Sequence, residues 1–176
     1  MTGRDRADFA EFVAARSPAL QRAAYLMVGD VALAQDLVQE ALTKTYVAWP
    51  RLRDKGNAEA YTRKAITTTA IGWFRRRSWK GEQATGWTPE TAVAGHDDDV
   101  TRSEWLWQAL MTLPARQRAA IVLRYYEDLT EAQTAEAMGC ARGTVKSQVS
   151  AGLSKLRERL GPDADLLPLH DLVVTR

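Results

Sequence analysis

The sequence contains very little of what metal, redox or membrane chemistry requires. A single cysteine, Cys140, among 176 residues excludes an internal disulfide and any site built from several thiolates. Two histidines, His96 and His170, leave little material for a histidine-based metal site or proton relay. The longest purely apolar run, residues 23–28, is far shorter than the ~20 residues that a membrane-spanning helix needs. The sequence therefore predicts a soluble cytoplasmic protein with no metal, no cofactor and no membrane contact.

Charge is unevenly distributed along a chain whose net charge is only +2. Residues 51–80 carry nine basic and two acidic side chains, and they end in three consecutive arginines at 75–77. Residues 81–104 carry six acidic side chains against one basic, and they include the run Asp97, Asp98 and Asp99. The basic block indicates either a polyanion-binding surface or a solvated helix end, and charge alone does not decide between them. The aspartate run is interpreted as a solvated loop, because nothing orders its carboxylates around a cation.

Apolar side chains recur at helical spacing, and no stretch keeps the two-residue alternation of a strand. We therefore predict an all-α fold with two small helical domains, over residues 1–80 and 101–160. A flexible acidic linker at 81–100 joins them, and a tail without an assignable motif follows at 161–176. Four buried stripes are expected: Ala34, Leu37, Val38, Ala41 and Leu42; Leu106, Ala109, Leu110 and Leu113; Val122, Tyr125, Tyr126 and Leu129; and Val145, Val149, Leu153, Leu156 and Leu160.

Residues 129–157 carry the pattern of a helix-turn-helix. A short helix ends at Gly139, which can adopt the positive φ of a tight turn, and a second helix is expected over about residues 142–160. Opposite its apolar stripe, the second helix presents short uncharged groups suited to base edges in a major groove: Thr144, Ser147, Gln148, Ala151 and Ser154. Basic side chains flank this face at positions suited to phosphates: Arg142, Lys146 and Arg157. An ordinary helical hairpin with a polar outer face is the alternative.

The N-terminal half offers two faces of different chemistry. In a helix beginning near Asp30, an acidic and amide-bearing strip lies opposite the apolar stripe: Asp36, Gln39, Glu40 and Thr43. This strip indicates either a docking surface for a basic or coiled-coil partner or a solvated face without a partner. A second helix, capped by Asn57 and running over residues 58–77, interleaves aromatic, basic and small groups on its outward side: Tyr61, Lys64, Ala65, Thr68, Gly72 and Arg75. That mixture favours stacking and phosphate contacts with a single nucleic-acid strand.

Together these motifs resemble a bacterial sigma factor of the sigma-70 family. They are similar to the extracytoplasmic-function group, which keeps only the second and fourth conserved sigma regions. Residues 36–42, DLVQEAL, resemble the segment that binds the clamp helices of the RNA polymerase β′ subunit. Residues 57–77 resemble the segment that melts and reads the minus-ten element, and residues 113–157 resemble the reader of the minus-thirty-five element. The RRRSW and GCxxGTVKSQ patterns are similar to a SigE-like branch found in actinobacteria.

The resemblance implies a factor that directs core RNA polymerase to one promoter class and has no catalytic residues of its own. Its implied partners are core polymerase, through the β′ clamp helices and the β flap, promoter DNA and an anti-sigma factor. The implied polymerase contacts are Asp36, Gln39 and Glu40. The implied minus-ten contacts are Asn57, Tyr61, Arg63, Lys64, Thr67, Thr68, Arg75, Arg76 and Arg77. The implied minus-thirty-five contacts are Arg116, Arg118, Arg142, Thr144, Lys146, Ser147, Gln148, Ser150 and Arg157.

The sequence also departs from the family pattern. Ala141 stands where most members have a serine or similar helix cap. Gln148 and Ala151 stand where many members have arginine. Thr68 and Gly72 replace the asparagine and aspartate that are common in the minus-ten helix. The promoter sequence therefore cannot be copied from better-known members. Two other classes stay open, a dimeric helix-turn-helix regulator that binds duplex DNA without polymerase and an enzyme acting on nucleic acid.

Overall fold

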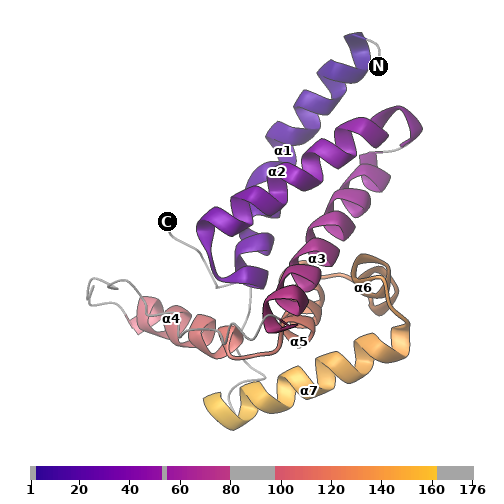
Figure 1. The fold of residues 1–176 in the computed structure, drawn as a ribbon. Helices are drawn as coiled ribbons and strands as arrows, with labels where there is room; N and C mark the ends of the chain where they lie inside the picture. The colour runs from indigo at the N-terminus through magenta and orange to yellow at the C-terminus, as the bar shows by residue number, and fades with distance from the viewer. Residues whose placement is uncertain (1–2, 53–54, 80–97, 162–176) are drawn as a thin grey trace.

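The computed structural model of the chain describes residues 3–52, 55–79 and 98–161, and every regular element within those ranges is helical. The N-terminal half consists of α1 (Gly3–Val28), α2 (Val31–Ala48), the 3₁₀ turn η1 (Trp49–Arg51) and α3 (Lys55–Trp79). The C-terminal half consists of α4 (Asp98–Met111), α5 (Ala115–Ile121), the π-helical turn η2 (Val122–Tyr126), α6 (Glu131–Met138) and α7 (Arg142–Leu160). Figure 1 shows α1, α2 and α3 packed together above α5, α6 and α7. The predicted all-α class is confirmed.

Most of the predicted linker at 81–100 and of the predicted tail at 161–176 lies outside the described residues. In the described part of the chain, no helix combines the length and the apolar character that crossing a membrane would take.

The start of α2 follows from local chemistry at the residues before it. Gly29 ends α1 with φ +75°, a conformation that costs a glycine little. Asp30 then caps α2, because its Oδ1 accepts a 2.7 Å hydrogen bond from the Leu33 amide. The expected stripe of α2 is confirmed, since its members are buried apart from the half-buried Leu42: Ala34, Leu37, Val38 and Ala41.

The helix-turn-helix is present where the sequence placed it. Thr130 and Gln133 form a reciprocal capping box at the start of α6, with bonds of 3.2 and 2.9 Å. Gly139 ends α6 in the left-handed region at φ +62°, as expected for the tight turn. Ala141 occupies the cap position of α7 and makes no side-chain cap bond, so this helix starts without the usual polar cap.

Two local expectations are wrong. Asn57 does not cap α3, because the helix already begins at Lys55 and Asn57 lies exposed in its first turn. Tyr125 is not a core residue and is 39% exposed. It lies in η2, where the wider π-helical turn changes the angular spacing that an α-helical pattern assumes.

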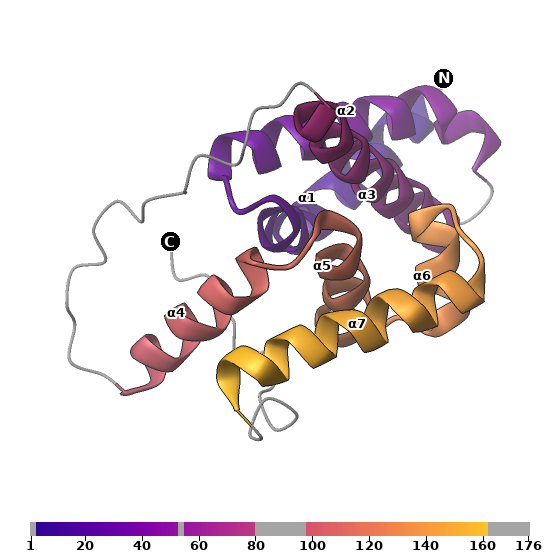
Figure 2. The same cartoon turned by 60° about the horizontal axis from the view of Figure 1, so that its bottom comes forward.

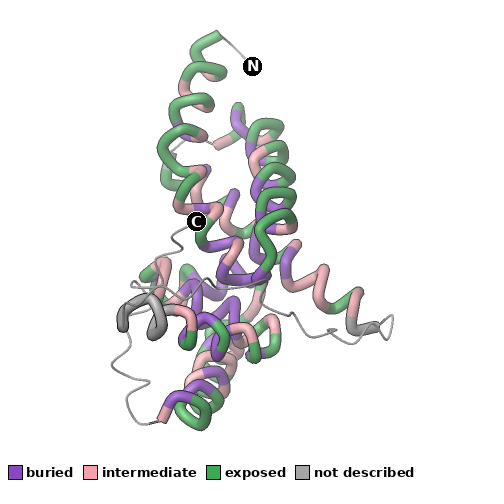
Figure 3. Tube along the Cα trace, turned by 90° about the vertical axis from the view of Figure 1, so that its left-hand side faces the viewer, coloured by how far each residue is buried: buried purple, intermediate pink, exposed green. Residues whose placement is uncertain are grey.

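The two halves share one core. Leu26 of α1, Leu110 of α4 and Ile121 of α5 are all fully buried in the same cluster. Tyr25 of α1 also stacks on Trp107 of α4, with ring centres 5.9 Å apart. Figure 2 shows α5 enclosed between α1 and α7, and in Figure 3 buried segments gather where the halves meet, while the first turns of α1 are exposed. The sequence left this arrangement open, and the structure packs the halves against each other.

Candidate nucleic-acid interfaces

The side of α7 that faces away from the core is accessible to solvent. Val145 is fully buried, while the expected contact positions are exposed or half-buried: Arg142, Thr144, Lys146, Ser147, Gln148, Ser150 and Arg157. Lys146 Nζ lies 3.7 Å from Glu131 Oε2, and both side chains are so exposed that this ion pair contributes little in water. The face therefore has the accessibility and the hydrogen-bonding groups that contact with base edges requires.

Two arginines of α5 that were expected to contact phosphates lie in different environments. Arg116 is exposed, whereas Arg118 is only 5% exposed. The Arg118 guanidinium donates to the Met27 carbonyl at 2.7 Å and to the Met111 carbonyl at 3.0 Å. Its central carbon lies 4.9 Å from the centre of the Phe74 ring. In this conformation Arg118 therefore joins the ends of α1 and α4 and does not face DNA.

The buried charge of Arg118 is compensated by helix ends. Burial lowers the pKa of Arg118 to about 10, because the charged form has lost most of its water. The guanidinium still carries its proton at neutral pH. Its two acceptor carbonyls belong to the last turns of α1 and α4, where the helix dipole concentrates partial negative charge.

The outward face of α3 presents an aromatic ring among cations. Tyr61 is 39% exposed, and the following expected contacts are exposed as well: Asn57, Lys64, Thr68, Arg75 and Arg76. Arg77 is half-buried, and its guanidinium carbon lies 5.2 Å from the centre of the Trp73 ring. This face therefore combines the stacking and phosphate-neutralising groups that single-strand binding uses.

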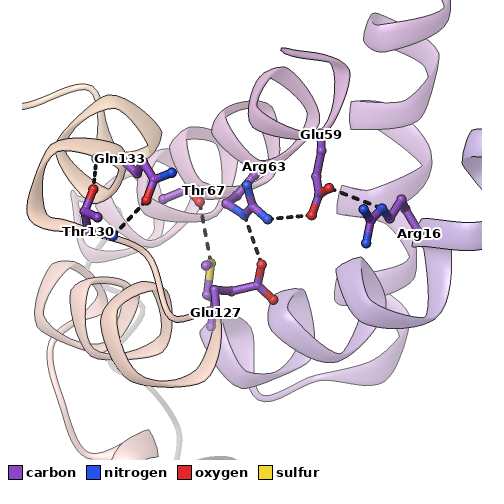
Figure 4. Close-up of polar contacts among 8 residues, drawn as sticks. Arg16, Glu59, Arg63, Thr67, Glu127, Thr130 and Gln133 are labelled. Carbon is purple, nitrogen blue, oxygen red and sulfur yellow. Dashed lines mark hydrogen bonds and ion pairs between the residues drawn. The ribbon is translucent and has the colours of Figure 1, made fainter. Parts of the chain in front are cut away.

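Two other members of the expected minus-ten set do not face solvent. Thr67 is fully buried, and its hydroxyl donates to the Met27 sulfur at 3.9 Å, so it belongs to the core side of α3. Arg63 is held between two carboxylates, Glu59 Oε1 at 2.8 Å and Glu127 Oε2 at 3.0 Å (Figure 4). Glu127 comes from the C-terminal half, so a contact between the halves removes Arg63 from the open face.

The acidic strip of α2 is exposed along its expected length. Asp36, Gln39 and Glu40 are exposed, while the positions between them face the core. Lys44 Nζ lies 2.6 Å from Glu40 Oε1, one helical turn along, with both side chains about half exposed. The strip can therefore present carboxylate and amide groups to a partner.

Sequence reasoning missed an apolar extension of this strip. Val47 is 74% exposed, and Tyr46 beside it is 40% exposed. Val47 follows Thr43 by four residues and therefore lies one turn further along the same side of α2. Helical spacing was the signal that could have identified this residue.

Two family models match the chain. The model of sigma-70 region 2 matches residues 12–80, and the model of sigma-70 region 4 matches residues 103–156. The first covers the helices that carry the acidic strip and the Tyr61 face, and the second covers the helix-turn-helix through most of α7.

Curated relatives match over most of their length. The chain is 37% identical over 153 residues to the RNA polymerase sigma-E factor of Streptomyces coelicolor, covering 87% of this chain and 86% of that protein. It is 32% identical over 164 residues to the ECF RNA polymerase sigma factor SigL of Mycobacterium tuberculosis, covering 89% and 86%. Among solved structures, the sigma factor RpoE in complex with the anti-sigma factor NepR from Bartonella quintana matches with a TM-score of 0.68 and 28% identity, over 89% of this chain and 98% of that one.

Proposed function

This chain belongs to the extracytoplasmic-function group of the sigma-70 family, whose members direct RNA polymerase to promoters. We propose that three of its surfaces carry out separate tasks: capture of the opened minus-ten strand, recognition of the minus-thirty-five element and binding to the polymerase. Residues 1–80 act as sigma region 2 and residues 101–160 as sigma region 4. Residues 81–100 link them, and residues 161–176 form a tail.

The outward face of α3 captures the opened minus-ten strand. An exposed base stacks on Tyr61, and such stacking contributes about 1–3 kcal/mol per base. Exposed cations along the same helix neutralise strand phosphates: Lys64, Arg75 and Arg76. Asn57 and Thr68 supply hydrogen bonds at either end of the Tyr61 region, and Arg77 adds positive charge.

The exposed side of α7 reads the minus-thirty-five element in the major groove. Thr144, Ser147 and Gln148 contact base edges, and Gln148 can pair in a bidentate manner with adenine. Exposed side chains that border this face contact the phosphates and so hold the helix in place: Arg116, Arg142, Lys146, Ser150 and Arg157. The same half of the chain contacts the β flap of the polymerase.

The acidic strip of α2 binds the clamp helices of the β′ subunit. Asp36, Gln39 and Glu40 provide the charged and amide groups, and the neighbouring Val47 adds apolar contact area. The polymerase supplies the catalytic chemistry, and the factor acts with it in the cytoplasm. An anti-sigma factor is a further partner, since the solved relative was crystallised with one.

The observation that carries this proposal most strongly is the helix-turn-helix with its accessible reading face. Gly139 sets the turn at φ +62°, and α7 then presents uncharged hydrogen-bonding groups bordered by cations. A dimeric regulator would use the same reading face but would not need the α2 strip or the Tyr61 face.

Run-off transcription with core polymerase on a genomic library tests the proposal. Addition of the chain should produce transcripts from one promoter class. Gln148→Ala should change the base preference at one upstream position while transcription still depends on the factor. If the chain alone bound those promoters tightly as a symmetric dimer and gave no transcripts with polymerase, the proposal would be wrong.

A further inference from the structure

The side chains of α7 that face away from the core form two stripes of different chemistry. Thr144, Gln148 and Ala151 follow one another at spacings of four and three residues, so they share one side of the helix. We call these three residues the uncharged stripe. Arg142 and Lys146 stand two residues before Thr144 and Gln148, a rotation of about 200° around the helix. The cations therefore point almost directly away from the uncharged stripe.

The uncharged stripe carries no side chain that pairs well with guanine. Guanine presents two acceptors in the major groove, N7 and O6, and arginine or lysine is the side chain that usually contacts both. The first cation on this side of α7 is Lys155, which lies one turn beyond Ala151. A recognition helix contacts bases mainly through its N-terminal residues, so Lys155 lies past the region that reads bases.

The groups that are present on the uncharged stripe match an A·T pair. The Gln148 amide can accept from adenine N6 and donate to adenine N7, and its side chain is half-buried at the edge of the accessible face. Against guanine, the amide oxygen would face the acceptor O6 without a proton between them. The methyl groups of Ala151 and Thr144 can contact the C5-methyl group of thymine. Both ends of an A·T pair therefore find a partner on this stripe.

Ser147 lies beside the uncharged stripe and has a hydrogen-bonding direction that the sequence does not reveal. Its hydroxyl donates to the Thr144 carbonyl of the same helix at 2.9 Å, and its side chain is exposed. Since this contact uses the only hydroxyl proton, the oxygen is left as an acceptor toward the groove. Adenine N6 and cytosine N4 are donors in the major groove, whereas guanine and thymine offer only acceptors there. Ser147 therefore also disfavours guanine.

We propose that α7 selects A·T pairs in the part of the minus-thirty-five element that its N-terminal turns read, with Gln148 on an adenine and Ala151 against a thymine methyl group. Guanine is rejected at the Gln148 position because the amide cannot satisfy both guanine acceptors. The basic side chains supply affinity through phosphates and add no base preference. This inference rests on the proposed role of α7 in reading the minus-thirty-five element.

The test uses the full chain, core RNA polymerase and a template library randomised over the minus-thirty-five element. Each template carries a transcribed barcode, so sequencing of the transcripts gives the base preference at every randomised position. The unmodified chain should favour adenine over guanine by about tenfold at one position, and Gln148→Arg should reverse this preference at the same position. Gln148→Glu should favour cytosine there, because a carboxylate accepts a hydrogen bond from cytosine N4.

A second substitution and a charge control complete the test. Ala151→Arg should create a guanine preference at a different position. Glu158→Gln adds the same single unit of positive charge at an exposed position near the end of α7 and should change no base preference. The preference of the unmodified chain is measured independently of any variant, so a variant that fails to fold does not decide the result.

The outcomes separate this inference from the proposed function. Selection of guanine by the unmodified chain at the position that the Gln148 variants alter would overturn the inference, and so would one base preference shared by all variants. In either case, factor-dependent transcripts would leave the proposed function standing. An absence of transcripts from every template with the unmodified chain would overturn both.

Discussion

The hydroxyl oxygens of Thr45 and Thr62 lie 2.7 Å apart, fully buried between α2 and α3. Each hydroxyl also lies close to a carbonyl of its own helix, 2.8 Å from Ala41 O for Thr45 and 2.7 Å from Ala58 O for Thr62. Two hydroxyl hydrogens therefore serve three short contacts, so the two threonines share one network. This network fixes α2, which carries the acidic strip, against α3, which carries the Tyr61 face.

Removal of one hydroxyl from this pair should cost stability. Thr45→Val is expected to lower the free energy of unfolding by about 1–2 kcal/mol, because Thr62 loses a buried partner. The double variant Thr45→Val with Thr62→Val should cost less than the sum of the single variants, since neither helix then keeps an unpaired hydroxyl. Urea denaturation of the unmodified chain, the two single variants and the double variant measures the coupling between the two hydroxyls. Additive effects would show that the two hydroxyls act independently.

Arg118 and Arg116 form a matched pair on one helix. Arg118→Met should lower the free energy of unfolding by about 2–4 kcal/mol, because two buried carbonyls at helix ends lose their donor. Arg116→Met should leave stability within about 0.5 kcal/mol, since Arg116 is exposed. Thermal and urea unfolding compare the two. Equal stability of both variants would contradict the structural role of Arg118.

The fold was largely predictable from sequence because its signals are local. The sequence predicts α7 over about residues 142–160, because an apolar stripe lies between Gly139 and Gly161. The structure shows the helix at Arg142–Leu160. The helical spacing also correctly predicted that Tyr61 and Lys64 lie on the outward face of α3.

The environments of Arg63 and Arg118 could not be predicted in that way. Their partners lie 64 residues away at Glu127 and 91 residues away at Met27. The periodicity of one helix reports which side is apolar, but it carries no information about a distant segment that covers a polar position. The resemblance to sigma factors implies DNA contacts for both arginines, but packing between the halves pairs Arg63 with Glu127 and Arg118 with the Met27 carbonyl.

Two glycines of α7 should respond in opposite ways to alanine. A Cβ on Gly143 would meet nothing within 4 Å, whereas a Cβ on the buried Gly152 would lie 3.0 Å from Ile121 Cγ1. Gly143→Ala should raise the free energy of unfolding by about 0.5–1 kcal/mol through helix propensity. Gly152→Ala should lower it by about 1 kcal/mol or more, because the fully buried Ile121 would have to shift within the core to admit the methyl group. Urea unfolding of both variants measures these changes, and a stabilised Gly152→Ala protein would show that α5 and α7 can move apart.

Phosphate contacts on α3 should appear in the salt dependence of DNA binding. Lys64→Ala with Arg75→Ala should reduce the slope of log affinity against log salt, by about 0.7 for each lost contact with a single strand. Anisotropy titrations with a single-stranded oligonucleotide at several salt concentrations measure the slope. Lys155→Ala removes an exposed cation at the far end of α7 and serves as a control whose slope should not change. An unchanged slope in the double variant would mean that Lys64 and Arg75 do not contact DNA.

The most direct measurement is the affinity of the chain for core RNA polymerase and its dependence on α2. The chain should bind at submicromolar concentrations, and Asp36→Ala with Glu40→Ala should weaken binding by at least about tenfold, a loss near 1.4 kcal/mol. Glu136→Ala with Glu158→Ala removes the same two charges from exposed positions of α6 and α7 and should bind like the unmodified chain. No association at micromolar concentrations, or equal weakening by both pairs, would contradict a polymerase-binding role for the α2 strip.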